Sequence, residues 1–127
     1  KFCPSIEVDE DAQRVNGFSK EILKDEPMFK SEIKAIREVL SDKVVLAYNS
    51  HFDATMLRNT ANKFDEPLEI NHECVMRLFQ NFTDRSYRTS LQNACYEMDV
   101  DIYQCHDALG DCYMVLELLR AMSNTKY

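Results

Sequence analysis

The stretch that decides the fold is VVLAYNSHFD, which occupies residues 44–53. Its first half, Val44 to Tyr48, is a continuous apolar run with β-branched residues, which is typical of a strand buried on both faces of an α/β sheet. A polar turn follows and ends in Asp53, where the apolar periodicity of a helix reaching about residue 64 begins. The sequence therefore predicts a carboxylate just beyond the end of a strand, where α/β folds place their sites.

A second stretch, HDALGD at residues 106–111, sets a histidine five residues before an aspartate at the start of a predicted helix over residues 107–122. Hard divalent cations prefer carboxylate oxygens, and two such ions activate a water and stabilise the leaving oxygen of a phosphodiester. A histidine titrates near neutral pH and can accept the proton of that water. Asp53, Asp111 and His106 therefore indicate part of a two-metal phosphodiesterase site.

The remaining pattern is α/β, with more helix than strand. Further helices are predicted over residues 9–15, 19–23, 29–40, 75–79 and 90–98, and short strands over residues 1–8 and 68–72. The helix at 107–122 is expected to face the core with Leu109, Met114, Val115, Leu118 and Leu119. The length of 127 residues suits a single domain, residues 1–127. One buried strand cannot form a sheet, so we expect this domain to be N-terminally incomplete and to lack its first strands.

Composition narrows the class of protein. The net charge of −7 argues against a protein that binds duplex DNA through a broad basic face. It does not argue against an enzyme that binds the end of a strand. The chain has no apolar run long enough to span a bilayer and no signal peptide, so no membrane partner is expected. The five cysteines form no C-x-x-C pair and are read as reduced thiols of a cytoplasmic protein.

Four stretches resemble, in order, the DEDDh 3′–5′ exonucleases, the DnaQ-like family with an RNase H-like fold. YNSHFDATML at residues 48–57 resembles the second exonuclease motif, and the stretch at 106–111 is similar to the third. AQRVNGFS at residues 12–19 and CVMRLF at residues 74–79 match the passages before and between these motifs. The resemblance implies an RNase H-like mixed sheet flanked by helices, two divalent cations (Mg²⁺ or Mn²⁺), and hydrolysis of single-stranded nucleic acid from its 3′ end.

The resemblance also implies roles for single residues and for the whole chain. Asp53 and Asp111 would be metal ligands, His106 the general base, and Asn49 and Phe52 would shape the substrate pocket, Phe52 mainly by packing. Nucleoside monophosphates would be released, and the domain would serve proofreading in a larger protein with a polymerase or another domain as its partner. The family's first motif, an Asp-x-Glu in the first strand, is missing from the 127 residues, and we expect it upstream of Lys1 or lost.

Other interpretations stay open on the residues alone. Asp53 suits a helix N-cap, and Asp111 suits an exposed helix face. A non-catalytic descendant of the fold, serving as a nucleic-acid-binding or protein-interaction module, would carry the same pattern. A Cys–His hydrolase using Cys105 or Cys112 with His106 is disfavoured, because adjacent residues in an extended segment do not face each other.

Overall fold

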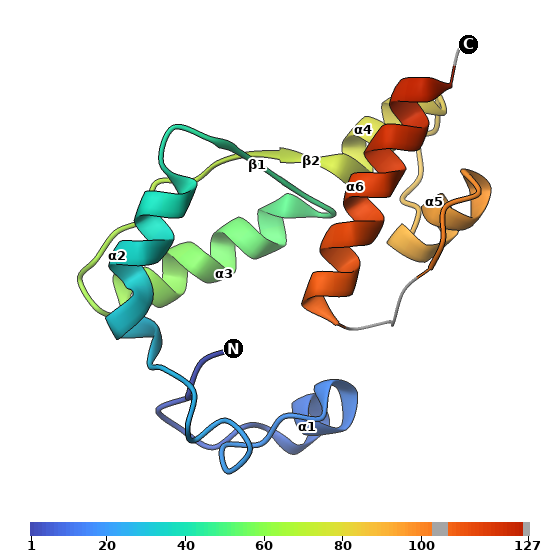
Figure 1. The fold of residues 1–127 in the computed structure, drawn as a ribbon. Coiled ribbons are helices and arrows are strands. Elements are labelled where there is room, and N and C mark those ends of the chain that lie inside the picture. The colour runs from blue at the N-terminus through green and yellow to red at the C-terminus, as the bar shows by residue number, and fades with distance from the viewer. Residues whose placement is uncertain (103–106, 126–127) are drawn as a thin grey trace. The chain divides into compact units, whose positions relative to one another are not determined.

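The computed structural model describes residues 1–102 and 107–125 (Figure 1). Its elements in chain order are α1 (Glu10–Asn16), α2 (Phe29–Leu40), β1 (Val44–Ala47), α3 (Ser50–Asn62), β2 (Asn71–Cys74), α4 (Val75–Phe82), α5 (Leu91–Glu97) and α6 (Ala108–Asn124). The chain forms two compact units. The first unit is Lys1–Lys43 with Leu57–Glu69, and the second unit is Val44–Met56 with Ile70–Tyr127.

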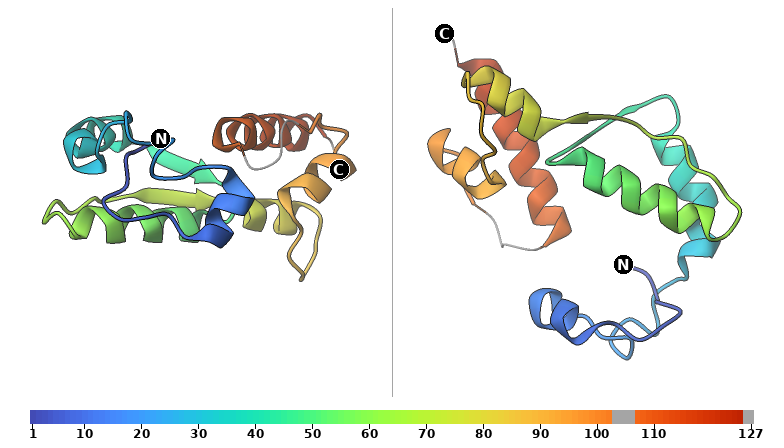
Figure 2. Two further views of the ribbon diagram at one scale, coloured as in Figure 1. Left: turned by 90° about the horizontal axis from the view of Figure 1, so that it is seen from below. Right: turned by 180° about the vertical axis from the view of Figure 1, so that it is seen from behind.

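The sheet of the second unit consists of β1 and β2 in parallel, in a register that pairs Val44 with Asn71 and Ala47 with Cys74. Parallel strands need a crossover connection, and α3 begins that crossover. The carboxyl ends of both strands therefore meet at one edge of the sheet. Figure 2 shows that α4 continues directly from β2, so the start of α4 lies at this same edge.

The prediction that β1 is buried on both faces is wrong. Val44 and Leu46 are 52% and 46% exposed, and they alternate with the half-buried Val45 and Ala47. Strand pairing occupies the edges of β1 and covers neither face, and in the described part of the chain the face that carries Val44 and Leu46 stays open. The side chains on one face of the strand consequently have no layer packed over them.

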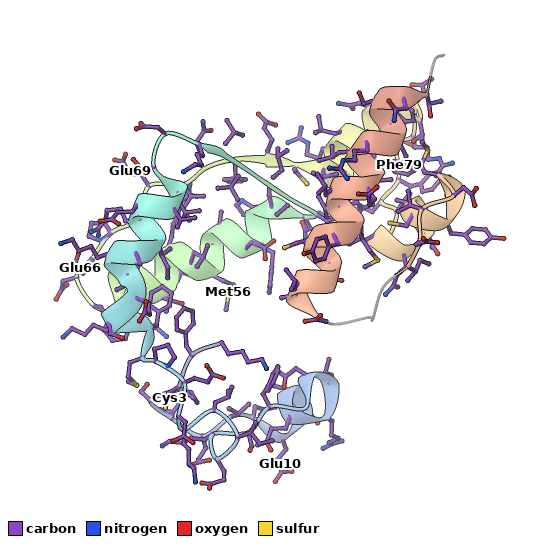
Figure 3. All side chains as sticks on the ribbon, viewed as in Figure 1. Cys3, Glu10, Met56, Glu66, Glu69 and Phe79 are labelled. Carbon is purple, nitrogen blue, oxygen red and sulfur yellow. The ribbon has the colours of Figure 1, made fainter. Side chains whose placement is uncertain are left out.

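The core of the second unit lies between α4, α5 and α6. Seven of its residues are almost fully inaccessible to solvent: Val75, Phe79, Ala94, Cys95, Met114, Val115 and Leu118. Phe79, labelled in Figure 3, is the largest side chain in this cluster. The predicted inward face of the last helix is confirmed for Met114, Val115 and Leu118, whereas Leu109 is exposed because it lies on the opposite side of the first turn of α6.

The first unit is organised around α2, which confirms the helix predicted over residues 29–40. Phe29 and Ile33 are buried on α2. The ring of Phe29 packs against those of Phe2 and Phe64, with centroid distances of 5.2 and 6.3 Å. Aromatic pairs in such edge-on and offset arrangements add to the stabilisation from burial.

Two further sequence predictions are corrected in the first unit. Residues 20–25 form turns rather than the predicted helix, although the Ser19 hydroxyl accepts a hydrogen bond from the Ile22 N–H, as a cap would. The predicted strand at residues 1–8 is reduced to an isolated bridge between Cys3 and Met28. Proline at position 4 removes a backbone donor, which limits any longer ladder there.

Turns in this chain rely on aspartate and asparagine rather than glycine. Left-handed backbone conformations occur at Asp42, Asn49, Asp65, Asp84 and Asp99, with φ between 52° and 60°. These two residue types tolerate the left-handed region better than other non-glycine residues. The chain has only two glycines, and Gly17, with φ of 74°, ends α1 in the same conformation.

None of the helices in the described part of the chain is both long and apolar enough to cross a membrane.

The packing of α4 against α5 and α6 generates a stability prediction. Replacing Phe79 with alanine should lower the free energy of unfolding by about 3–5 kcal/mol, because the change removes a buried ring and leaves a cavity. Replacing Tyr96, which is 80% exposed, with alanine should change it by no more than about 0.5 kcal/mol. Urea unfolding followed by circular dichroism measures both. Equal effects of the two changes would show that this cluster does not hold the second unit together.

Candidate functional site

The turn between β1 and α3 positions the first predicted site residues. Asn49 adopts a left-handed conformation with φ of 60°, and its carbonyl accepts a hydrogen bond from the Phe52 N–H at 3.0 Å. The α3 helix begins at Ser50, three residues earlier than predicted, so Asp53 lies inside the first turn. Asp53 is therefore not the N-cap of this helix, and that alternative is excluded.

The environment of Asp53 differs from that of an ordinary surface carboxylate. Although the residue is exposed, partial burial of its carboxyl group raises the pKa above the usual value, while a hydrogen bond from its own backbone N–H opposes the shift. A raised pKa means that the negative charge is incompletely solvated by the protein around it. A cation placed beside the carboxylate would reverse this effect.

The thiol of Cys74 lies close to the turn after β1. Burial would raise the pKa of this thiol, but the nearby backbone N–H groups of Arg77, Ser50, Asn49 and Met76 hold the pKa below its ordinary value. Two of these groups belong to the turn after β1 and two to the first turn of α4. The cluster forms because the parallel register places the ends of β1 and β2 together.

Tyr48 anchors the turn from its other end. Its hydroxyl donates to the Thr89 carbonyl at 2.6 Å. Burial, and then the nearby thiols of Cys95 and Cys74 and the carboxyl of Glu97, raise the pKa of Tyr48 to about 12. The phenol is therefore held in its neutral, donating form. The segment before Thr89 is fixed in turn by a salt bridge of Arg85 to Glu97 at 2.5 Å.

Asp111 and His106 are the other two residues predicted to take part in the chemistry. Asp111 is half-buried in the first turn of α6, and its N–H donates to the Asp107 carbonyl at 2.9 Å. Asp53 and Asp111 belong to the same compact unit. His106 lies outside the described residues, as does Cys105.

The substrate-pocket residues show one departure from expectation. The ring of Phe52 is 63% exposed, whereas the predicted packing role requires burial. Met56, one turn further along α3 and labelled in Figure 3, is also exposed. Residues four apart share one face of a helix, so Phe52 and Met56 form an exposed apolar pair beside Asp53.

The described residues do not by themselves make up a metal centre. Across residues 1–102 and 107–125, no three histidine, cysteine, aspartate or glutamate side chains are grouped as metal ligands. Two carboxylates would leave most positions around a pair of Mg²⁺ ions to water. The residues present thus fit part of a divalent-cation site and not the whole of it.

Comparison with known proteins identifies the family. A family model described as "Exonuclease" matches residues 4–119. The chain belongs to the DnaQ-like exonuclease family. This exonuclease-family chain is 26% identical over 129 residues to DNA polymerase III subunit epsilon of Rickettsia prowazekii (strain Madrid E), and 25% identical over 121 residues to that of Rickettsia felis (strain ATCC VR-1525 / URRWXCal2).

The matches cover nearly all of this chain but only part of its relatives. They span 94% and 91% of the exonuclease-family chain, yet 55% and 53% of the two epsilon subunits. Among solved structures, Exonuclease X in complex with 5′ overhanging duplex DNA matches with a TM-score of 0.71 and 18% identity, over 98% of this chain and 71% of that chain. This likeness establishes the fold, a mixed α/β fold of the RNase H-like type, of whose sheet the described residues form two strands.

Sequence reasoning missed four residues that hold the candidate site together: Ser50, His72, Cys74 and Thr89. Ser50 and Cys74 lie inside stretches that the motifs had already singled out. His72 and Thr89 carry no periodicity or motif that marks them. The supporting contacts of His72 and Thr89 become visible only in the three-dimensional structure.

The Tyr48 hydrogen bond predicts a stability effect with a defined pH dependence. Tyr48→Phe should lower the free energy of unfolding by about 1 kcal/mol below pH 10, because the Thr89 carbonyl loses its donor. The pKa of Tyr48 is about 12 in the folded chain against 10.0 for the free side chain, so the folded state binds the proton more tightly between these values. The advantage of the wild type should therefore shrink as pH rises from 10 to 12.

Urea unfolding at pH 8, 10, 11 and 12 measures this difference. Tyr87→Phe is the control, because Tyr87 is an exposed tyrosine in the loop that contains Thr89. It should change the free energy of unfolding by less than about 0.5 kcal/mol. A Tyr48→Phe effect that is absent at pH 8, or that grows with pH, would contradict the assigned hydrogen bond.

Proposed function

We propose that this exonuclease-family chain is part of a metal-dependent 3′–5′ exonuclease that releases nucleoside monophosphates from the 3′ end of nucleic acid. The observation that carries the proposal is the position of Asp53 in the first turn of α3, directly beyond β1, within a chain matched over residues 4–119 by the exonuclease family model. In α/β folds this end of the strands is where ligands bind.

The proposed roles follow the two motifs. Asp53 and Asp111 are ligands of divalent cations, Mg²⁺ or Mn²⁺, and His106 is the general base that accepts a proton from the attacking water. When bound, the cations stabilise the charge that develops at the scissile phosphate. Asn49 contacts the terminal nucleotide, and the exposed ring of Phe52 offers it an apolar surface.

The rest of the metal site is proposed to come from outside residues 1–127, on a strand bearing Asp-x-Glu. Two observations support this. The described residues supply no group of three metal ligands, and Val44 and Leu46 expose apolar side chains on a strand with one neighbour. An additional strand would pair with β1 at the edge that β2 does not occupy, and would bring carboxylates to the sheet. Residues 1–127 would then form one N-terminally incomplete domain.

The proposed partners follow from the relatives' names. The matched relatives are epsilon subunits of DNA polymerase III, and the structural neighbour is described in complex with DNA. For this chain we propose a single-stranded 3′ end as substrate and proofreading beside a polymerase or another domain. A second candidate, a non-catalytic nucleic-acid-binding module, is favoured by the lack of a three-ligand group in the described residues.

A comparison of two forms of the protein separates these candidates. A form extended at the N-terminus by a strand bearing Asp-x-Glu should shorten a linear single strand stepwise from its 3′ hydroxyl in Mg²⁺ or Mn²⁺ and spare a closed circle. Residues 1–127 alone should cleave little and melt at a lower temperature, because β1 keeps an unpaired edge. Gel analysis of end-labelled strands and thermal melting measure both. Equal cleavage by the two forms would refute the missing ligand pair, and binding without cleavage by the extended form would favour the non-catalytic module.

The proposed base predicts a mutational effect in the extended form. His106→Ala should lower turnover by about 10²-fold or more, the usual scale of general acid–base catalysis, while the melting temperature stays the same. His51→Ala provides the control, because His51 is an exposed histidine on α3 to which no role is assigned. Single-turnover release of nucleotide measures both variants. Turnover of His106→Ala within about threefold of the wild type would exclude His106 as the base.

A further inference from the structure

Ser50 is a buried polar residue at the point where the candidate site begins. Only 2% of its surface is exposed, and it is the first residue of α3, three positions before Asp53. Its hydroxyl oxygen lies 2.7 Å from Nδ1 of His72. A buried hydroxyl costs stability unless it is hydrogen-bonded, so this contact is an obligatory part of the local structure.

His72 comes from a different element and from far along the chain. It is a half-buried residue of β2, paired in register with Val45 of β1. The contact therefore ties the first turn of α3 to the neighbouring strand, across 22 residues of sequence. The hydroxyl and the imidazole can each donate or accept, so either neutral tautomer of His72 maintains the bond.

The backbone of the same turn also lies close to β2 at a second point. The N–H groups of Asn49 and Ser50 are near enough to the thiol of Cys74 to lower its pKa. His72 and Cys74 lie two apart on β2 and thus point to the same face of the sheet. The turn therefore lies against this face of β2, and the side-chain contact to His72 is the hydrogen bond that ties the two elements together.

We propose that Ser50 and His72 are a positioning pair, which locks the first turn of α3 onto β2 and so sets the direction of the Asn49 and Asp53 side chains. Neither member of the pair is assigned to the substrate or to a cation. The part of this inference that concerns catalysis rests on the proposed function. The part that concerns the rigidity of the turn does not.

The chemistry of the contact supplies a matched set of variants. An asparagine amide at position 72 places a polar atom near the site of Nδ1, whereas the longer glutamine places it near Nε2. His72→Asn should therefore keep the bond to Ser50, and His72→Gln should lose it. Ser50→Ala removes the other partner. His51→Gln changes the exposed neighbouring histidine and is the control.

The first measurement is hydrogen exchange of the backbone amides of residues 49–53 in the 127-residue chain. We expect Ser50→Ala and His72→Gln to accelerate exchange there by about five- to tenfold, the effect of losing one hydrogen bond. His72→Asn and His51→Gln should match the wild type. The double variant Ser50→Ala/His72→Gln should exchange no faster than either single variant, because both remove the same contact.

The second measurement is steady-state hydrolysis by the form extended with the Asp-x-Glu strand. Ser50→Ala and His72→Gln should lower kcat by about tenfold with KM nearly unchanged, and His72→Asn should restore it, as expected for a misaligned reacting group. A variant that has merely lost stability would instead lose activity in proportion to its unfolded fraction, which melting curves report.

The outcomes are distinct. Unchanged exchange in Ser50→Ala and His72→Gln, or equal exchange in His72→Asn and His72→Gln, overturns the positioning pair. Accelerated exchange together with normal hydrolysis by Asp53→Asn supports the pair as a lock on the turn, and overturns the proposed role of Asp53 instead.

Discussion

The parallel pairing of β1 with β2 is the interaction on which the rest of the second unit depends. Its register, Ala47 opposite Cys74, brings the turn after β1 and the start of α4 to one edge of the sheet. The backbone N–H groups of both segments then lie near a single thiol, that of Cys74, and lower its pKa. A shift of one residue in this register would turn every side chain of one strand to the opposite face. The position of the candidate site is therefore determined by the pairing of β1 with β2.

Much of the fold could be predicted from the sequence, because local periodicity determines it. The helix predicted over residues 29–40 matches α2, and the apolar run from Val44 matches β1. The errors have a common physical origin. Burial of β1 on both faces and the helix at residues 19–23 both required tertiary packing, which the described residues do not provide at those places. Propensity alone does not determine structure where packing is incomplete.

For the candidate site, the sequence indicated the acidic residues but not what holds them. Asp53 and Asp111 belong to stretches whose spacing indicates their chemistry. By contrast, the contact between Ser50 and His72 joins residues whose types are unremarkable and whose separation follows no period. Supporting contacts of this kind arise from the three-dimensional meeting of two strand ends, so a single sequence cannot reveal them. The exposure of Phe52 likewise depends on which side of α3 is covered.

The use of aspartate in left-handed turns has a consequence for the electrostatics of the molecule. Four of its 22 acidic residues occupy such positions: Asp42, Asp65, Asp84 and Asp99. Glycine or asparagine would serve the same backbone geometry without a charge, and four such replacements would take the net charge from −7 to −3. More than half of the net negative charge thus comes from aspartates that occupy left-handed turn positions. Asparagine at these four positions would remove this acidity at little structural cost, and the repulsion of a polyanion would weaken with it.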